Sequence, residues 1–143
     1  MGRLATYLSF IRFSHSVFAL PFALTGALLA WQRAPFAWIQ IAWVIVAMVT
    51  ARSAAMGFNR LVDARMDALN PRTAMREIPR GALSRGDATG FVVVMSAAFV
   101  AASFQLNATC GWLSPLALAI VFWYSLAKRF TSYTPAFLGL AMA

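Results

Sequence analysis

Residues 36–71, which read FAWIQIAWVIVAMVTARSAAMGFNRLVDARMDALNP, decide the fold of this chain. The first half of the stretch is strongly apolar, and the whole of it holds one glycine and no proline before the closing Asn70-Pro71 pair. It therefore predicts a single helix from Phe36 to Leu69. Such a helix is ~50 Å long at about 1.5 Å per residue, whereas the hydrocarbon core of a membrane is ~30 Å thick. Its last turns must therefore project from the membrane or lie over a cavity at its surface.

The composition of the chain indicates a membrane protein. Hydrophobic residues make up 62% of it and charged residues 11%, and the mean hydropathy is +0.72. An ordinary soluble domain has about 25% charged residues, so this chain has too few to cover a surface that faces water. The net charge of +8 comes from basic residues in the connections between apolar runs, which favours membrane topology and not nucleic-acid binding. The single cysteine, Cys110, excludes an internal disulfide or a cysteine metal cluster.

Further apolar runs predict more membrane helices at about residues 13–31, 88–106 and 112–127, and the start of another at Pro135. We therefore expect an all-α, polytopic transmembrane helix bundle with about four spans and the start of a fifth. The last run reaches Ala143 after only nine residues, too few to cross a membrane. We accordingly expect residues 1–143 to be a single, incomplete membrane domain from the N-terminal portion of a longer protein.

The distribution of Lys and Arg predicts the orientation of these helices. With the N-terminus inside, Arg33 is the one basic residue outside, and the other eleven lie in cytoplasmic positions. This asymmetry places the N-terminus and a motif loop of about residues 52–87 in the cytoplasm.

An Asn/Asp/Asp ladder stands at the end of the long helix. Asn59, Asp63 and Asp67 are four residues apart, a spacing that stacks their side chains on one helix face. Carboxylates on successive turns repel each other unless a cation lies between them, and Mg²⁺ is usually held by one or two carboxylates and substrate phosphates. In the alternative interpretation, both aspartates only form ion pairs with nearby arginines.

Arginines surround the ladder, at positions 60, 65, 72, 76, 80 and 85. Guanidinium groups bind phosphate oxygens in a bidentate manner, which explains a preference for Arg over Lys. Metal-binding acids beside phosphate-binding arginines are typical of a site for a diphosphate leaving group. Glu77 is expected to form an ion pair with Arg72 or Arg80, and Asp87 to lie at the N-terminus of the next helix, where its charge favours the helix dipole.

The exact strings of this region resemble a known family. They are NRLVDARMD at residues 59–67, NPRTA at 70–74, REIPRG at 76–81, SHSVFALPFA at 14–23 and YSLAKRFT at 124–131. Together they resemble the UbiA-type membrane prenyltransferases, most closely the 4-hydroxybenzoate polyprenyltransferase-like branch, over essentially the whole chain.

The resemblance implies a bundle of about nine membrane helices that binds polyprenyl diphosphate through Mg²⁺ held by two aspartate-rich motifs. Carried onto this sequence, Asn59, Asp63 and Asp67 form the first motif and act in catalysis, with Asp63 and Asp67 as the metal ligands. Basic residues would bind the diphosphate, namely Arg72, Arg76, Lys128 and Arg129. The second motif has no counterpart, since no acidic residue follows Asp87. We therefore expect this chain alone to be inactive.

The implied reaction is Mg²⁺-dependent transfer of a polyprenyl group to an aromatic acid of the 4-hydroxybenzoate type, in ubiquinone biosynthesis. Three alternatives remain: prenylation of a futalosine-pathway intermediate for menaquinone and, from other classes, a membrane transporter or a non-catalytic membrane scaffold. Arg12 is either an interfacial anchor or a partner for the carboxylate of the aromatic acid, and the same choice applies to Arg52, with the anchor favoured. His15 is a candidate substrate contact. The expected partners are the two substrates and membrane lipid, without nucleic acid, in a bacterial inner membrane.

Overall fold

The computed structural model describes residues 3–11, 14–31 and 37–127, and every regular element in these ranges is a helix. In chain order the helices are α1 (Arg3–Phe10), α2 (Ser14–Trp31), α3 (Trp38–Leu69), α4 (Arg85–Leu106) and α5 (Ala108–Ala127). The all-α prediction is confirmed. The predicted long helix is also confirmed, because α3 runs unbroken for 32 residues to Leu69.

Among the described residues, three helices are long and apolar enough to cross a membrane: α3, α4 and α5. The chain is thus an integral membrane protein, and large side chains such as Trp38, Trp112 and Trp123 are exposed on it where lipid would surround them. Within α2 the apolar helical stretch Leu20–Leu29 is shorter, so the first span stays a prediction. The start of the fifth span lies in residues 128–143, outside the described ranges.

The helices α4 and α5 begin earlier than the sequence predicts, at Arg85 and Ala108. Side chains that cap the first turns explain both starts. The Ser84 hydroxyl accepts a hydrogen bond from the backbone N–H of Asp87 at 3.0 Å, and the Asn107 side chain accepts one from the N–H of Cys110 at 2.7 Å. Such caps satisfy N–H groups that have no partner within the helix. Asp87 lies in the first turn of α4, as expected.

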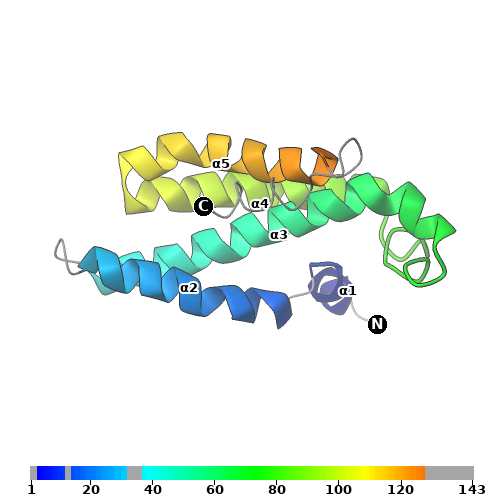
Figure 1. Cartoon of the computed structure of the whole chain (residues 1–143), viewed down its shortest axis with the longest axis horizontal. Coiled ribbons are helices and arrows are strands. Elements are labelled where there is room, and N and C mark those ends of the chain that lie inside the picture. Colours follow the sequence, from blue (N-terminus) through cyan, green and yellow to red (C-terminus); the bar gives the residue numbers. More distant parts are fainter. Residues whose placement is uncertain (1–2, 12–13, 32–36, 128–143) are drawn as a thin grey trace.

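The long helix α3 is the centre of the bundle (Figure 1). It packs most extensively against α4, and it also contacts α2 and α5. In Figure 1, α2 lies along one side of α3, and α4 and α5 lie along the other. The helix α1 is seen nearly end-on at the end of the bundle where α3 finishes, so it runs across the direction of the other helices. We call this end, which carries residues 59–87, the motif end.

The connection from α3 to α4 folds back against α3. Asn70 ends the helix, and the Thr73 hydroxyl donates a hydrogen bond to the carbonyl of Asp67 at 3.0 Å, which satisfies a carbonyl of the last turn. Gly81 turns the chain with φ of +74°, a conformation that favours glycine. The backbone N–H of Leu83 then bonds to the carbonyl of Glu77 at 3.0 Å. These contacts give residues 70–84, the arginine loop, a defined path beside the end of α3.

Candidate functional site

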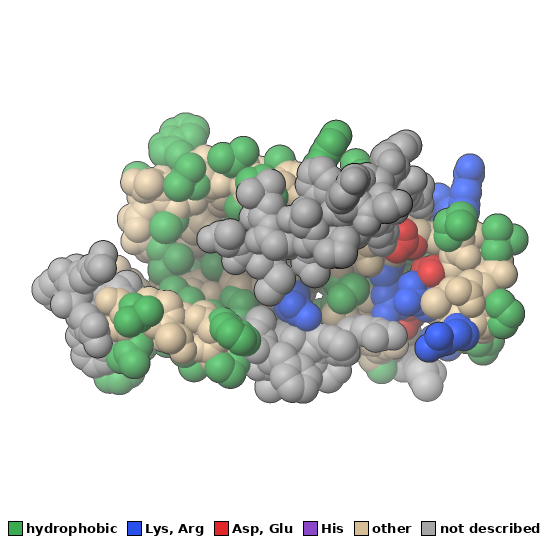
Figure 2. Space-filling model, viewed as in Figure 1, with side chains coloured by type: hydrophobic (Ala, Val, Ile, Leu, Met, Phe, Trp, Pro, Cys, Tyr) green, Lys and Arg blue, Asp and Glu red, His purple; other side chains and the backbone are tan. Residues whose placement is uncertain are grey.

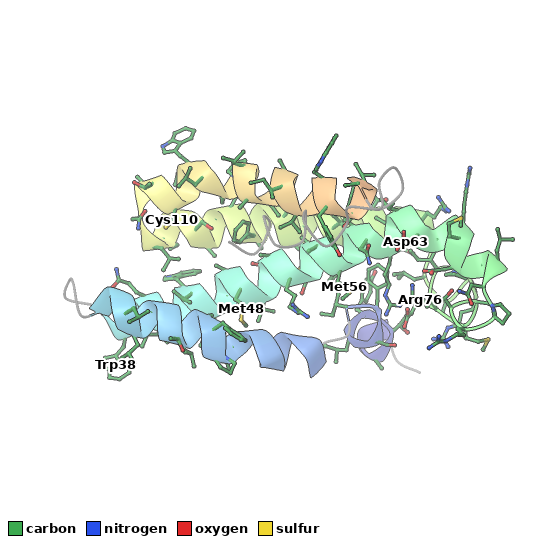
Figure 3. All side chains as sticks on the ribbon, in the orientation of Figure 1. Trp38, Met48, Met56, Asp63, Arg76 and Cys110 are labelled. Carbon is green, nitrogen blue, oxygen red and sulfur yellow. The ribbon has the colours of Figure 1, made fainter. Side chains whose placement is uncertain are left out.

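The Asn/Asp/Asp ladder lies on the last three turns of α3, at the motif end. Asp67 is buried, with 7% of the residue exposed, while Asn59 and Asp63 are half-buried. Figure 2 shows basic and acidic side chains gathered at this end of the visible face, and Figure 3 places the labelled Asp63 and Arg76 there together. The segment that carries chemistry is therefore the projecting part of α3, as the sequence predicts.

Arg76 of the arginine loop binds directly to the ladder. Its Nη1 atom lies 2.7 Å from both carboxylate oxygens of Asp67. The side chain of Asp67 is 10% exposed and that of Arg76 is 29% exposed, so the arginine is the partner that reaches toward solvent. Arg76, a predicted phosphate-binding residue, is thus in direct contact with Asp67, a predicted metal ligand, at a distance typical of a charge-assisted hydrogen bond.

Glu77 does not pair with Arg72 or Arg80, so that expectation was wrong. Its Oε2 atom accepts a hydrogen bond from Nη1 of Arg60, and both side chains are buried, with 7% of Arg60 and 6% of Glu77 exposed. Its Oε1 atom accepts a hydrogen bond from the hydroxyl of Ser9 on α1. The loop turns Glu77 inward toward α3, and sequence distance alone does not reveal that turn.

The carboxylates present fit part of a magnesium site. Within the described ranges no group of three or more His, Cys, Asp and Glu side chains is placed to hold a metal ion. Asp63 and Asp67 provide two oxygen donors on one helix face, which matches the one or two carboxylates that Mg²⁺ uses when substrate phosphates complete its shell. Arg76 places a positive charge beside Asp67, which is the place that Mg²⁺ would take if this carboxylate held it.

Arg52, for which the sequence favours an anchor role, carries a buried polar atom. It lies seven residues before Asn59, close to two helical turns, and therefore deeper in the bundle on the same side of α3. Its Nε atom is buried and has no hydrogen-bond partner among the described residues. A guanidinium that served only as an anchor would reach polar headgroups. The seven-residue offset from Asn59 places Arg52 on the ladder side of the helix from the sequence alone.

The remaining predicted residues are not brought to the ladder by a described contact. Arg72 is exposed, and its backbone N–H bonds to the side chain of Asn70 at 3.0 Å. The side chains of Arg12, His15, Lys128 and Arg129 lie outside the described part of the chain. Their roles stay predictions.

An apolar groove of about 650 Å³ lies between α3, α4 and α5 near the motif end. Phe58 of α3 and Phe122 of α5 stack there with their ring centroids 4.3 Å apart, and Arg85 and Thr89 line it together with aliphatic residues of α3 and α4. Phe58 and Val62 line this groove, and each immediately precedes a ladder residue, Asn59 and Asp63. Apolar space therefore lies beside the polar ladder, a combination that sequence reasoning did not locate.

Comparisons with known proteins agree with this architecture. Among curated proteins, the chain is 34% identical over 152 aligned residues to the 4-hydroxybenzoate octaprenyltransferase of Paracidovorax citrulli, covering 99% of this chain and 49% of that protein. It is 35% identical over 91 residues to the mitochondrial 4-hydroxybenzoate polyprenyltransferase of Arabidopsis thaliana, covering 64% of this chain and 22% of that protein. The chain spans about half the length of those curated relatives that align with nearly all of it.

Solved structures give the same result. The apo structure of a UbiA homolog from Aeropyrum pernix K1 matches with a TM-score of 0.82 and 40% identity, over 90% of this chain and 46% of that one. A structure of digeranylgeranylglyceryl phosphate synthase matches with a TM-score of 0.78 at 18% identity, over 87% and 44%, which is a likeness of fold alone. Residues 19–143 match the family model described as the UbiA prenyltransferase family. With its all-helical membrane bundle and its aspartate ladder on α3, this chain belongs to the UbiA prenyltransferase family.

Proposed function

We propose that the complete protein transfers a polyprenyl group from polyprenyl diphosphate to an aromatic acid of the 4-hydroxybenzoate type, in a Mg²⁺-dependent reaction of quinone biosynthesis. One observation carries the proposal. This chain, which belongs to the family, has Asp63 and Asp67 on one face of α3, and Arg76 donates hydrogen bonds to the carboxylate of Asp67. The curated relatives are named for prenyl transfer to 4-hydroxybenzoate.

In this proposal the ladder and the arginine loop bind the diphosphate. Asp63 and Asp67 would hold Mg²⁺, which when bound neutralises charge on the departing diphosphate. Arg76 is near enough to exchange its contact with Asp67 for a phosphate oxygen, and its partial exposure leaves room for this exchange. Arg72, Lys128 and Arg129 are further proposed contacts to the diphosphate, and Asn59 a polar contact at the ladder.

The bond changes follow from the two substrates. The allylic C–O bond breaks and its electron pair leaves with the diphosphate. A ring carbon of the aromatic acid then forms a C–C bond with the allylic carbon, and the ring loses a proton. The protein contributes position, charge stabilisation and the exclusion of water, since water would capture the allylic cation. The groove beside Phe58 and Phe122 is a candidate path for the isoprenoid tail.

Arg52 is the proposed contact for the carboxylate of the aromatic acid. Its buried Nε has no hydrogen-bond partner in the described ranges, and a buried donor without a partner is costly unless a ligand satisfies it. Arg12 and His15 stay as proposed contacts on the acceptor side. We further propose that the motif end faces the cytoplasm at a bacterial inner membrane, as the distribution of basic residues predicts.

The test uses the complete protein in membranes with radiolabelled prenyl diphosphate, 4-hydroxybenzoate and Mg²⁺. We expect product from the wild type, and loss of product in Asp63→Asn and Asp67→Asn, which keep the side-chain size and remove the charge. Asp87→Asn is the matched control, because Asp87 lies in the first turn of α4, outside the ladder, where it accepts a hydrogen bond from the Ser84 hydroxyl. If the protein binds the diphosphate only with Mg²⁺ but forms no product, the acceptor is a different aromatic compound, such as the futalosine-pathway intermediate. The absence of both binding and product would reject the reaction and favour a transporter.

A further inference from the structure

A buried cluster of charged and aromatic side chains joins three segments at the motif end. Glu77 of the arginine loop is 5% exposed, and both of its carboxylate oxygens have partners, Arg60 on α3 and Ser9 on α1. The ring of Phe10, which is fully buried, lies beneath the guanidinium of Arg60, whose Cζ is 5.9 Å from the ring centroid. The loop, the motif helix and the N-terminal helix therefore meet at one carboxylate.

This cluster is built on close backbone approach. Gly57 lies one turn before Arg60, and a Cβ atom there would be 2.8 Å from Val92 and 3.3 Å from Phe10. Phe10 also packs edge-on against Phe91 of α4, with ring centroids 5.9 Å apart. These contacts hold α1 on α3 and α4. They therefore fix the position from which the Ser9 hydroxyl donates its hydrogen bond to Glu77.

The two ion pairs of the loop divide into different kinds. Arg60 and Glu77 are both buried, and their opposite charges are paired there. Asp67 and Arg76 are paired near the surface, where Arg76 keeps 29% of its side chain exposed. A pair with both charges buried is hard to separate because each charge left alone has lost its water. In the second pair only Asp67 is buried, and the partly exposed Arg76 can exchange its partner more readily.

Glu77 immediately follows Arg76 in the chain, and their partners Arg60 and Asp67 are seven residues apart on α3. That separation is close to two turns, or ~10 Å along the helix axis, on the same helix face. Two neighbouring loop residues are thus fixed to two points of one face, and the buried pair determines where the backbone of Arg76 lies.

We infer that Glu77 is a positioning residue: held by Arg60 and by the hydroxyl of Ser9 on α1, it sets the loop backbone so that Arg76 reaches Asp67 and a diphosphate bound there. The inference rests on the proposed function for the identity of the ligand. It assigns α1, which lies outside the ladder, a part in diphosphate binding. It also assigns Arg60 to Glu77 and not to phosphate, although Arg60 follows Asn59 directly.

The first experiment measures the position of the loop without reference to activity. The complete protein, with Cys110→Ser and any further cysteine removed, carries Met75→Cys on the loop and Leu116→Cys on α5, both at exposed positions, for spin labelling. The double variant Arg60→Met/Glu77→Met removes both buried charges together, so no unpaired charge remains to unfold the protein. We expect a narrow distance distribution in the wild type and a broad one in the double variant. Arg65→Met, which removes an exposed arginine of α3, should leave the distribution narrow.

The second experiment measures binding of inorganic pyrophosphate with Mg²⁺. We expect the double variant to bind at least about tenfold more weakly, as for the loss of a charge-assisted contact. We expect Arg76→Ala to have a similar effect in the wild type and little additional effect in the double variant, because Arg76 no longer reaches the site. Ser9→Ala should weaken binding less, and Ser9→Thr should restore it.

The inference is overturned if the double variant keeps the narrow distribution, or if Arg76→Ala weakens binding by the same factor in both backgrounds. In that case Glu77 only stabilises the fold. A complete protein that transfers no prenyl group would reject the proposed reaction, and the distance measurement would still decide the role of Glu77.

Discussion

Substituting Gly57 with Ala tests the packing on which the motif end depends. Gly57 is buried where α3 meets α4 and α1, and an added Cβ would lie 2.8 Å from Cγ2 of Val92 and 3.3 Å from Cε1 of Phe10. Carbon atoms prefer a separation of about 3.5–4.0 Å. The neighbours must therefore move apart by roughly 0.7 Å or more at Val92.

Two effects of opposite sign compete in this variant. Alanine favours a helix over glycine by about 1 kcal/mol, and overpacking a close contact costs about 1–3 kcal/mol. The closest contact is to a β-branched side chain on a long helix, which has little freedom to turn away. The difference between the two terms is about 0–2 kcal/mol, and because Val92 has little freedom to move we expect Gly57→Ala to lower the free energy of unfolding by up to about 2 kcal/mol.

The measurement is unfolding of the complete protein in detergent, followed by tryptophan fluorescence. Gly90→Ala is the matched control on α4, since a Cβ there meets nothing within 4 Å and should give only the helix-propensity gain of about 1 kcal/mol. Val92→Ala removes the clashing methyl group, so Gly57→Ala should cost less in that background. If Gly57→Ala stabilises the protein as much as Gly90→Ala does, the close approach of the three helices is wrong.

Two predictions concern the proposed substrates. Arg52→Met should raise the KM for the aromatic acid at least about tenfold, because it removes a buried donor that we assign to the carboxylate of that acid. Binding of pyrophosphate should stay unchanged. An unchanged KM for the acid would contradict the assignment. Phe122→Trp should reduce the volume of the groove and weaken the binding of long-chain prenyl diphosphates, while pyrophosphate binds as before. Competition assays with both ligands measure this difference. An equal effect on both ligands would show that the isoprenoid tail lies elsewhere.

Most of the architecture follows from local features of the sequence. A long stretch without proline, ended by Asn70-Pro71, predicts α3 to its last residue. The starts of α4 and α5 were missed by a few residues because hydropathy marks the apolar part of a helix, whereas Ser84 and Asn107 cap polar first turns. The four-residue spacing of Asn59, Asp63 and Asp67 needs only helix geometry to bring these residues to one face.

Partners across the loop required the tertiary structure. The sequence places Glu77 among several arginines, and its distance along the chain favours Arg72 and Arg80 as partners. The structure pairs it with Arg60 and Ser9, because the loop folds back and α1 docks beside Gly57. Similarly, burial of Arg52 Nε depends on which helices surround α3.

By itself, the sequence determined the helical membrane class, the end of α3 and the face that carries the ladder, since helix periodicity and the transfer of apolar groups from water act locally. Only the tertiary structure decided which arginine neutralises which acid. That choice depends on loop direction, on close backbone contacts at one glycine and on burial that makes an unpaired charge costly, and each of these is a property of segments distant in the chain.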